Sequence, residues 1–215
     1  MNRAFFLTGT DTGVGKTLIA AALLGAAAAR GLRALGMKPV AAGGDEDIAA
    51  LIAAGSVAAP RELTNPYLLG EPLSPHLAAR RDGLSIDVEH LARCCEALRQ
   101  RADFLIVEGA GGFRVPLTET LDGADLAARL GLPLILVVGL RLGCLNHALL
   151  TEEAIRARGL PLAGWVANQV VPKMACVEEN VATLRARIDA PLLGFVPHQA
   201  APDAARIAAL LELPS

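Results

Sequence analysis

A glycine-rich segment from Gly9 to Thr17 joins an apolar, strand-like run to a long helical pattern near the N-terminus. Gly-Lys-Thr at such a junction is typical of a phosphate-binding loop, because the glycines turn backbone amides inward and the helix N-terminus adds partial positive charge. Lys16 is expected to reach the β- and γ-phosphates of a nucleotide, and the Thr17 hydroxyl to join the coordination of Mg²⁺. Five residues separate Gly9 from Gly15, where the strict pattern has four, so an ordinary glycine-rich turn is the alternative.

Short apolar runs alternate with helical patterns through most of the chain. The expected strands cover residues 4–8, 34–39, 104–107, 134–139, 164–167 and 192–196. The expected helices cover residues 15–30, 87–101, 146–158, 175–188 and 203–211. Apolar strands separated by helices favour an α/β fold, a single doubly wound and mostly parallel sheet with helices on both faces. Ligands of such a sheet bind at the carboxyl ends of its strands. Residues 43–76 are rich in proline and glycine, so loops over the sheet edge are expected there.

Length and composition exclude several classes of protein. The 215 residues fit one domain over 1–215, and no apolar run approaches the roughly 20 residues of a membrane span. The net charge of -2 gives no general attraction to nucleic acid or to an anionic membrane. A strand-like run follows the first three residues and leaves no room for a signal peptide, so a cytoplasmic protein is expected. The four cysteines form no CxxC pair and are expected to be free thiols.

Nucleotide turnover also requires carboxylates around the metal and positive charge near the γ-phosphate. Glu108 ends an apolar strand and precedes several glycines, which indicates a metal position; capping a loop is the alternative. Asp47, near the start of a short helix, is the second candidate ligand, but Asp45 and Glu46 compete with it, and a favourable charge at the helix N-terminus explains it equally. Lys38 ends the second strand and is expected to point into the same crevice, unless it is a solvated surface lysine.

Two further segments place polar residues beside strand ends. Residues 143–147 open a helix with a glycine and then Asn146, which suits both an anion pocket and a simple helix cap. Asn168 ends another strand, where its amide would either recognise a base or satisfy backbone groups. These alternatives stay open on the residues alone.

Together these segments resemble the dethiobiotin synthetases. The matching segments are residues 8–17, 36–40, 65–67, 71–76, 107–112, 137–147 and 163–168. They follow the order of the family across nearly the whole chain, and the ordered set is highly specific although each segment alone is modest.

The resemblance implies a P-loop NTPase, Rossmann-like fold and a homodimer with its active site at the interface. Its small-molecule partners would be 7,8-diaminononanoate (7,8-diaminopelargonic acid), CO₂ and Mg-ATP, with no nucleic acid and no membrane. One amine would capture CO₂ as a carbamate, and a carbamate oxygen would attack the γ-phosphate to give a carbamic–phosphoric anhydride. The second amine would then close the ureido ring, releasing dethiobiotin, ADP and phosphate.

By the same resemblance, Lys16 and Lys38 are the expected catalytic cations, and Thr17, Asp47 and Glu108 the expected metal ligands. ATP would be bound by Gly13, Val14, Gly15, Lys16, Thr17, Leu18, Glu108, Gly109, Ala110, Gly111, Asn168, Gln169, Pro197, His198 and Gln199. The diamine would be bound by Thr12, Lys38, Ala42, Gly111, Gly112, Cys144, Leu145 and Asn146, the last three supplied by the neighbouring subunit for the distal carboxylate.

The chain departs from the family pattern in three places. Gly13 stands where well-known members carry a glutamate, and Ala42 stands where they place a substrate-binding serine. The segment 43–47 is also shorter than its counterpart. Because both lysines and Glu108 are retained, altered affinity rather than altered chemistry is expected.

Three rival functions fit the sequence less well. Amide ligases of the same P-loop group carry an additional glutaminase domain, for which 215 residues leave no space. ATPase switches that position DNA or division machinery have a signature lysine early in the loop, where this chain has Asp11. A small-molecule kinase leaves the matches at 143–147 and 165–168 unexplained.

Overall fold

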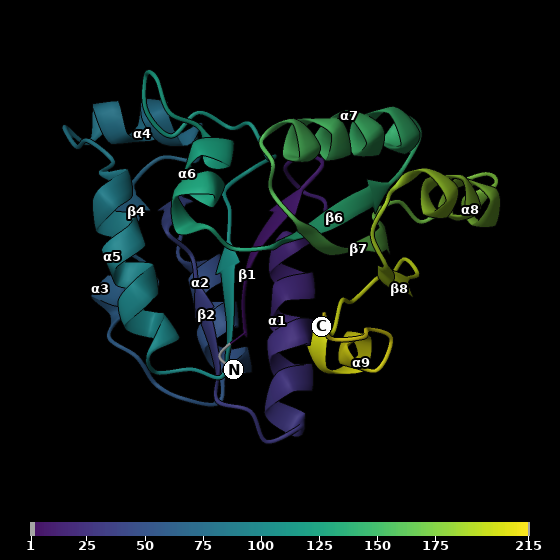
Figure 1. Cartoon of the computed structure of the whole chain (residues 1–215), viewed down its shortest axis with the longest axis horizontal. Helices are drawn as coiled ribbons and strands as arrows, with labels where there is room; N and C mark the ends of the chain where they lie inside the picture. The colour runs from purple at the N-terminus through teal and green to yellow at the C-terminus, as the bar shows by residue number, and fades with distance from the viewer. Residues whose placement is uncertain (1–2, 215) are drawn as a thin grey trace.

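The computed structural model describes residues 3–214, and its centre is a six-stranded sheet with the strand order β2-β5-β1-β6-β7-β8 (Figure 1). Its strands are β1 (Arg3–Gly9), β2 (Ala34–Met37), β5 (Phe104–Glu108), β6 (Leu134–Leu140), β7 (Leu162–Gln169) and β8 (Leu192–Val196). Each neighbouring pair is parallel, which confirms the expected sheet type. A small second sheet pairs β3 (Val40–Ala42) with β4 (Tyr67–Leu69), also in parallel.

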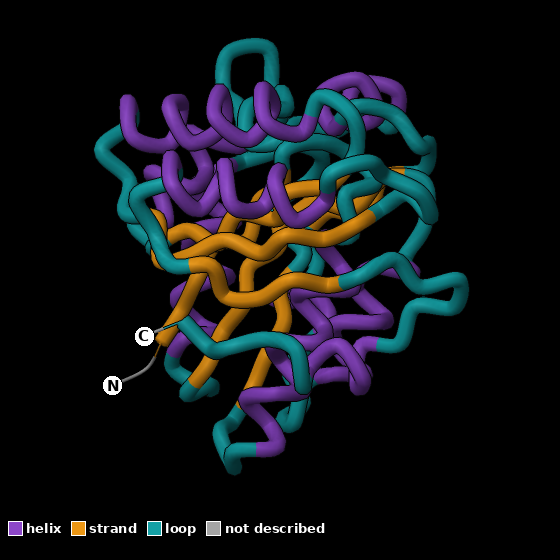
Figure 2. The backbone as a smooth tube through the Cα atoms, turned by 90° about the vertical axis from the view of Figure 1, so that its right-hand side faces the viewer, coloured by secondary structure: helices purple, strands orange, loops and turns teal. Residues whose placement is uncertain are grey.

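Successive residues of the central strands enter hydrophobic clusters on opposite faces of the sheet, as the period of two in a strand requires. On β5, Phe104 and Ile106 pack into one cluster, whereas Leu105 and Val107 pack into another. One face is covered by α1 (Lys16–Ala29), α2 (Glu46–Ala54) and α9 (Ala204–Ala208). The other face is covered by α5 (Val88–Arg99), α6 (Gly123–Leu130), α7 (Cys144–Ala157) and α8 (Val177–Arg187). Figure 2 shows the strands between the two helical layers, so the doubly wound arrangement is confirmed.

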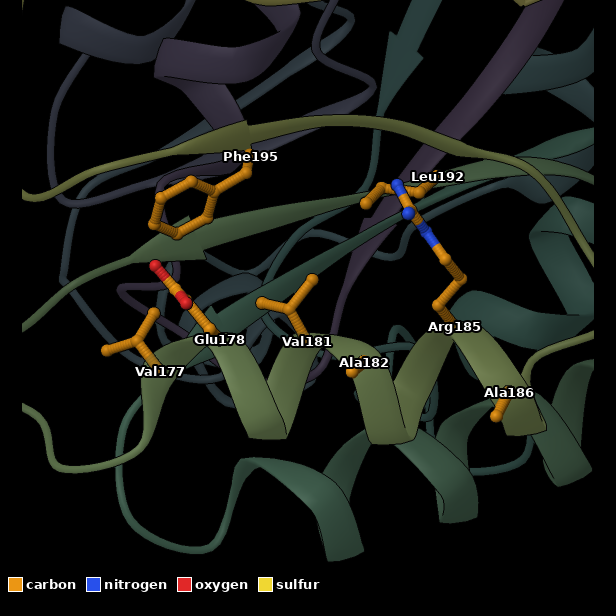
Figure 3. A pocket seen from close by; sticks show the side chains of 8 residues that line it. All are labelled: Val177, Glu178, Val181, Ala182, Arg185, Ala186, Leu192 and Phe195. Atoms are coloured by element: carbon orange, nitrogen blue, oxygen red, sulfur yellow. The ribbon is translucent and has the colours of Figure 1, made fainter.

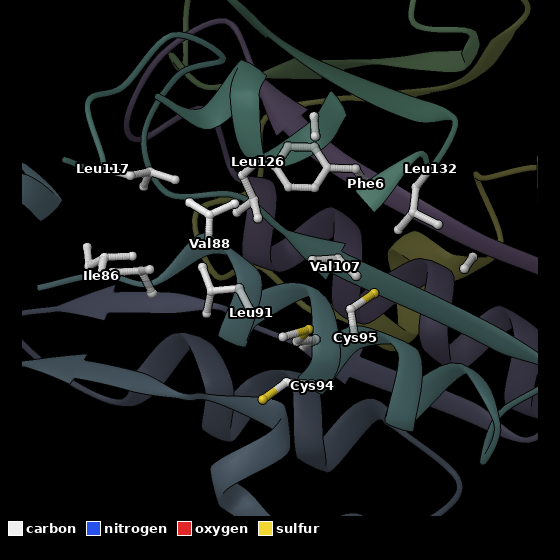
Figure 4. Packing of buried hydrophobic residues seen from close by; sticks show 14 of the residues in the cluster. Phe6, Ile86, Val88, Leu91, Cys94, Cys95, Val107, Leu117, Leu126 and Leu132 are labelled. Atoms are coloured by element: carbon white, nitrogen blue, oxygen red, sulfur yellow. The ribbon is translucent and has the colours of Figure 1, made fainter. Parts of the chain in front are cut away.

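The core beneath α5 and α6 supports the strand from which Glu108 emerges (Figure 4). Phe6 of β1 and Val107 of β5 pack there against Leu91 of α5 and Leu126 of α6, all four almost completely buried. Burying each such side chain stabilises the fold by about 1.5–3 kcal/mol relative to leaving it exposed. This packing fixes the carboxyl ends of β1 and β5 side by side.

The strand order places the phosphate loop where the winding of the sheet changes direction. From β1 the chain passes to β2 and β5 on one side, and later to β6, β7 and β8 on the other. Open α/β sheets bind their ligands in the crevice at such a point. The loop after β1 therefore lies at the predicted binding edge.

The expected helices are present with shifted ends, and some elements were missed. Residues 43–76 are not only loops, because they contain α2, α3 (Arg61–Thr64), β4 and the start of α4 (Pro75–Arg81). The helix α9 is shorter than the expected 203–211, and α6 was not expected at all. Within residues 3–214, none of the helices combines the length and the apolar character needed to cross a bilayer.

Two corrections concern residues of the predicted site. The strand β2 ends at Met37, two residues earlier than expected, because the Lys38 amide donates to the Thr64 carbonyl at 2.8 Å instead of extending the ladder. The helix α7 begins at Cys144 rather than Asn146, and Gly143 is its N-cap with a left-handed φ of 93°. Neither shift moves Lys38 or α7 away from the binding edge.

Candidate active site

A cluster of charged and polar side chains, of which Lys38 and Glu108 are buried, lies where the end of β5 meets the starts of α1 and α2. Lys38 Nζ is 2.6 Å from Glu108 Oε1 and 2.7 Å from Asp47 Oδ2. The Thr17 hydroxyl is 2.9 Å from the same Glu108 oxygen and 2.8 Å from Asp47 Oδ1. Because a hydroxyl carries one hydrogen, Thr17 donates to one of these carboxylates at a time. Four residues that the sequence singled out are thus in direct contact.

The acids that compete with Asp47 point elsewhere. Asp45 pairs with Arg61 at 3.4 Å. The Glu46 carboxylate folds back against its own loop, since a Cβ on Gly44 would lie 2.1 Å from it. Of these three acids, Asp47 is the one whose carboxylate contacts Thr17 and Lys38. The geometry therefore favours Asp47 among the alternatives left open above.

Burial and the neighbouring opposite charges shift the pKa values of these side chains in opposite directions. Glu108 has no exposed surface, and burial raises the pKa of its carboxyl although Lys38 and Thr17 oppose the rise. Burial alone would lower the pKa of Lys38, but the carboxylates of Glu108 and Asp47 outweigh it and hold that pKa above its ordinary value. Burial alone would raise the pKa of Asp47, yet Lys38 holds it below the usual range. Lys38 therefore stays a cation, held between two acceptors.

The same oxygens suit a hard divalent cation. Mg²⁺ binds proteins through one or two carboxylates and takes further ligands from substrate phosphates. Glu108 Oε2 is buried and has no hydrogen-bond partner, and the Lys38 ammonium already holds a cationic position between Glu108 and Asp47. Within residues 3–214, no group of three or more His, Cys, Asp or Glu side chains forms a metal cage. The carboxylate oxygens of Glu108 and Asp47 are thus of the type that Mg²⁺ prefers as ligands.

Glycine shapes the phosphate loop. Gly13 and Gly15 have φ values of 73° and 86°, in the left-handed region that other L-residues rarely adopt. From β7, Asn168 Nδ2 donates to the Val14 carbonyl at 2.8 Å and so holds the loop from the side. The Asn168 amide thereby satisfies a backbone group, which is one of the two roles considered for it.

Lys16 is buried within the loop. Its Nζ donates to the Asp11 carbonyl at 3.1 Å. Burial lowers the pKa of Lys16 to about 8, and the charge of Glu108 opposes this shift. A phosphate that replaced the carbonyl would stabilise the ammonium form, so the loop is suited to an anionic ligand.

Gly15→Ala is expected to abolish most nucleotide binding. A Cβ at Gly15 would lie 2.3 Å from Asn168 Nδ2, so the methyl group would displace the amide that holds the loop. We expect ATP affinity to fall by about 10-fold or more, since the left-handed φ adds backbone strain of about 1–2 kcal/mol. Gly13→Ala is the matched control, because its φ is also positive but a Cβ there meets nothing within 4 Å. Equal losses in the two variants, measured by calorimetry, would show that the Asn168 contact is unimportant.

One cavity, of about 200 Å³, borders the loop on the Asn168 side and gathers most residues predicted to bind nucleotide. Its predicted lining residues are Gly13, Gly15, Leu18, Asn168, Gln169, Pro197, His198 and Gln199. Sequence reasoning missed four others, Val170, Val196, Pro202 and Ile207. Val170 follows β7, Val196 ends β8, Pro202 precedes α9 and Ile207 lies within α9. Their apolar character gave no signal distinct from core packing.

A second cavity, of about 430 Å³, borders the first residues of the loop and the loop after β5. Thr12 and Gly112, both predicted to bind substrate, line it, and Gly111 lies beside Thr12. The residues missed by sequence reasoning are Thr10, Asp11, Phe113, Arg114, Val115, Leu150, Thr151 and Ala154. The phosphate loop is therefore a shared wall between two cavities of different size.

Some residues that were predicted to bind ATP or the diamine line neither of these two cavities. Val14 packs in the core beneath the loop. Ala42 lies on β3, and the Cys144 side chain is buried against α8, with its sulfur 4.0 Å from Asn180. Asn146 is exposed on the first turn of α7, and neither it nor Leu145 is among the described residues that line these two cavities.

A larger cavity lies away from this chemistry, between α8 and β8 (Figure 3). It measures about 530 Å³ and is lined mainly by apolar side chains, including Val181, Leu192 and Phe195. Glu178 and Arg185 are its charged lining residues, and none of the predicted site residues borders it. Size alone therefore does not locate the site.

Comparison with solved structures supports the fold. MinD, the septum site-determining protein of Pyrococcus horikoshii in complex with Mg-ADP, aligns with a TM-score of 0.59 over 93% of this chain and 82% of that chain, at 16% identity. A ParA family ATPase of Chlorobium tepidum aligns with a TM-score of 0.58 over 97% and 89%, at 13% identity. At these identities the likeness concerns the fold alone.

The model of the AAA domain family matches residues 3–206. With the parallel sheet and the glycine-rich loop, this match defines the chain as a P-loop nucleotide-binding domain of the AAA type. Its sequence is 56% identical to the ATP-dependent dethiobiotin synthetase of Aromatoleum aromaticum, over 99% of this chain and 98% of that protein. It is 50% identical to the enzyme of the same name from Nitrosospira multiformis, over 99% and 96%. The chain belongs to the ATP-dependent dethiobiotin synthetase family and is a ligase.

Proposed function

We propose that this chain converts 7,8-diaminononanoate, CO₂ and Mg-ATP to dethiobiotin, ADP and phosphate, a step of biotin biosynthesis. The observation that carries the proposal is the phosphate loop between two cavities, beside the buried Lys38 and Glu108 and the half-exposed Asp47. A nucleotide in the smaller cavity and a diamine in the larger one would meet at this cluster. Family membership supports the same reaction.

The reaction would proceed through an activated carbamate. One amine of the diamine adds to CO₂ and loses a proton, giving the carbamate. A carbamate oxygen then attacks the γ-phosphorus of ATP, and the bond to the β-phosphate oxygen breaks to release ADP. The second amine attacks the carbonyl carbon of the anhydride, the carbon–oxygen bond breaks, and phosphate leaves as the five-membered urea ring closes. ATP turns oxide, a poor leaving group, into phosphate.

The side chains would act by neutralising charge. The carbamate and the γ-phosphate are both anions that must approach within bonding distance, so fixed cations at the site lower the barrier. Lys16 would bind the β- and γ-phosphates, and Lys38 would turn from its carboxylate partners toward the carbamate. Both ammonium groups are largely buried, which strengthens their attraction for a bound anion.

Thr17, Asp47 and Glu108 would hold Mg²⁺ together with phosphate oxygens. The metal ion would supply charge neutralisation at the transferred phosphoryl group. For the nucleotide, the loop amides of residues 13–18 and the residues 108–111 would surround the phosphates. Asn168, Gln169 and the segment Pro197, His198 and Gln199 would contact the base.

The diamine would lie against Thr12, Gly111 and Gly112 in the cavity of about 430 Å³, which is the larger of the two cavities beside the phosphate loop. Ala42 lacks the hydroxyl that family members place there, so one hydrogen bond would be lost or supplied by water. We further propose a homodimer in which Cys144, Leu145 and Asn146 of each subunit receive the distal carboxylate in the partner's site. The Cys144 amide donates to the Arg141 carbonyl at 3.0 Å, so the Leu145 and Asn146 amides of the first turn of α7, which have no partners within the helix, would favour an anion. We expect this single domain to act in the cytoplasm.

Asn146→Ala is expected to weaken diamine binding more than ATP binding. A hydrogen bond to a carboxylate contributes about 1.5–3 kcal/mol, so the KM for the diamine should rise about 10-fold or more while the KM for ATP changes little. Glu153→Ala, an exposed position on the same helix, is the control and should leave both constants unchanged. The reverse pattern, with ATP affected more than diamine, would place the carboxylate pocket elsewhere.

A switch ATPase is the main alternative, because MinD and ParA proteins share the fold. Two features argue against this role. The loop carries Asp11 where such switches have their signature lysine, and the sequence relatives at 50–56% identity are synthetases.

The direct test mixes the purified protein with diaminononanoate, bicarbonate and Mg-ATP and detects the cyclic urea by mass spectrometry. We expect dethiobiotin only when all three are present, with one ADP formed per ring. Nucleotide binding without ring formation would overturn the proposed reaction and leave a binding or switch role.

A further inference from the structure

An acid stands inside the phosphate loop, where a negative charge opposes the binding of phosphates. Asp11 lines the larger cavity, and each of its oxygen atoms has a partner. Its carbonyl accepts from Lys16 Nζ at 3.1 Å, and Oδ1 accepts from the Thr12 amide at 2.7 Å. Oδ2 accepts from Arg141 Nη2 in an ion pair. Asp11 thus connects Lys16, Thr12 and Arg141.

Arg141 lies after β6, the strand that neighbours β1 on the side opposite to β5. It follows β6 and begins the turn that opens α7, because its carbonyl accepts from the Cys144 amide at 3.0 Å. The end of β6 also contacts the loop directly, through the Gly139 amide and the Thr10 hydroxyl at 3.4 Å. The Arg141–Asp11 pair therefore links the first half of the phosphate loop to the start of α7.

We propose that Arg141 is a positioning residue for the diamine substrate, acting through Asp11 to fix Thr12 at the wall of the larger cavity. This inference rests on the proposed function, since it assigns the diamine to that cavity. The pair neutralises the Asp11 charge, and it holds the Asp11 carboxylate in the orientation in which Oδ1 accepts from the Thr12 amide. The ion pair that the Arg141 side chain forms in the described part of the chain is with Asp11, which is not one of the proposed nucleotide-binding residues.

Because of its position, the Arg141–Asp11 pair is expected to affect binding of the diamine more than binding of ATP. Asp11 and Thr12 line the larger cavity, whereas the described lining of the nucleotide cavity begins at Gly13. Losing Arg141 would leave the Asp11 charge unbalanced and Thr12 less well fixed, next to the carbamate. ATP would still be held by Gly13 and Gly15 at the unchanged second half of the loop.

Loss of an ion pair that has only a structural role at the surface is not expected to change the KM for the diamine. The side chains of Arg141 and Asp11 are 38% and 45% exposed, and pairs of this exposure contribute little to stability. Arg158 and Asp125 form a comparable pair at 2.6 Å, with Arg158 following the distant end of α7. Arg158→Gln is therefore the matched control, since it removes a similar ion pair whose two residues do not line the cavity.

The test measures KM and kcat for the diamine and for ATP in Arg141→Gln, Asp11→Asn and the double variant. We expect Arg141→Gln to raise the KM for the diamine about 10-fold, because small errors in position weaken a productive complex. The KM for ATP should rise by a smaller factor, since Gly13 and Gly15 still hold the nucleotide, and the melting temperature should change little, as should every constant in Arg158→Gln. Arg141→Lys should recover part of the loss, and the double variant should resemble one single variant, because the two residues act together.

Additive effects in the double variant, or an unchanged KM for the diamine in Arg141→Gln, would overturn the inference. If the wild-type protein makes no cyclic urea, the proposed function fails, and hydrogen exchange of the peptide covering residues 9–15 still tests the link. Arg141→Gln should then speed exchange in that peptide, whereas Arg158→Gln should not. Equal exchange in both variants would also overturn the inference.

Discussion

Lys38→Ala should lower kcat for ring formation by about 100- to 1,000-fold, because it removes a buried cation that neutralises charge in the transition state. Lys38 is 4% exposed and contacts both Glu108 and Asp47. The affinity for ATP should change little, since the loop and Lys16 remain. The measurement is steady-state kinetics of ADP release, together with calorimetric titration of ATP.

Unfolding of the Lys38→Ala variant would also lower the measured kcat, so the fold must be tested separately. Removing Lys38 leaves Glu108 buried beside Thr17, and the pKa of Glu108 should rise further so that the carboxyl becomes protonated. Retained ATP binding shows that the variant is folded. Lys173→Ala, which removes an exposed lysine, is the control and should keep full turnover. Wild-type kcat in Lys38→Ala would remove Lys38 from the mechanism.

Glu108→Gln should lower turnover by a similar factor, about 100-fold or more, and should raise the Mg²⁺ concentration needed for half-maximal rate. The amide keeps the size of the side chain but loses the charge that binds a divalent cation. Thr17 and Lys38 can still hydrogen-bond to the amide oxygen, so the fold should persist. Titration of Mg²⁺ at saturating ATP measures the shift.

A parallel pair of variants separates the acids that compete at the start of α2. Asp47→Asn should raise the Mg²⁺ requirement as Glu108→Gln does, because Asp47 contacts Thr17 and Lys38. Asp45→Asn should leave it unchanged, because Asp45 pairs with Arg61. If Asp45→Asn has the larger effect, the assignment of the second carboxylate is wrong.

The fold and the charged cluster were predictable because each left a local signal. The apolar strands alternate with helical patterns, and Gly-Lys-Thr follows the first strand. Glu108 stands where a buried strand ends, and parallel strands end at a common edge of the sheet. The contact of Lys38 with Glu108 therefore follows from topology, although the two residues are 70 positions apart.

The structural features that were not predicted left weak signals in the sequence, or none. The helix α6 was missed although the sequence shows the residue types of its ends, with Asp122 and Asp125 spaced as in a capping box and Gly131 after the last turn. The strands β3 and β4 have three residues each, too few for a period of two to be recognised. The pairing of Asp11 with Arg141 spans 130 positions, and no spacing rule connects them.

In the proposed reaction, the γ-phosphoryl group of ATP is transferred to an oxygen of the substrate carbamate. The most direct measurement supplies freshly dissolved, doubly labelled CO₂ carrying ¹³C and ¹⁸O, stops the reaction before the label exchanges with water, and analyses both products by mass spectrometry. We expect a ring carbonyl that carries ¹³C and a released phosphate that carries one ¹⁸O. A labelled ring accompanied by phosphate without ¹⁸O would contradict it.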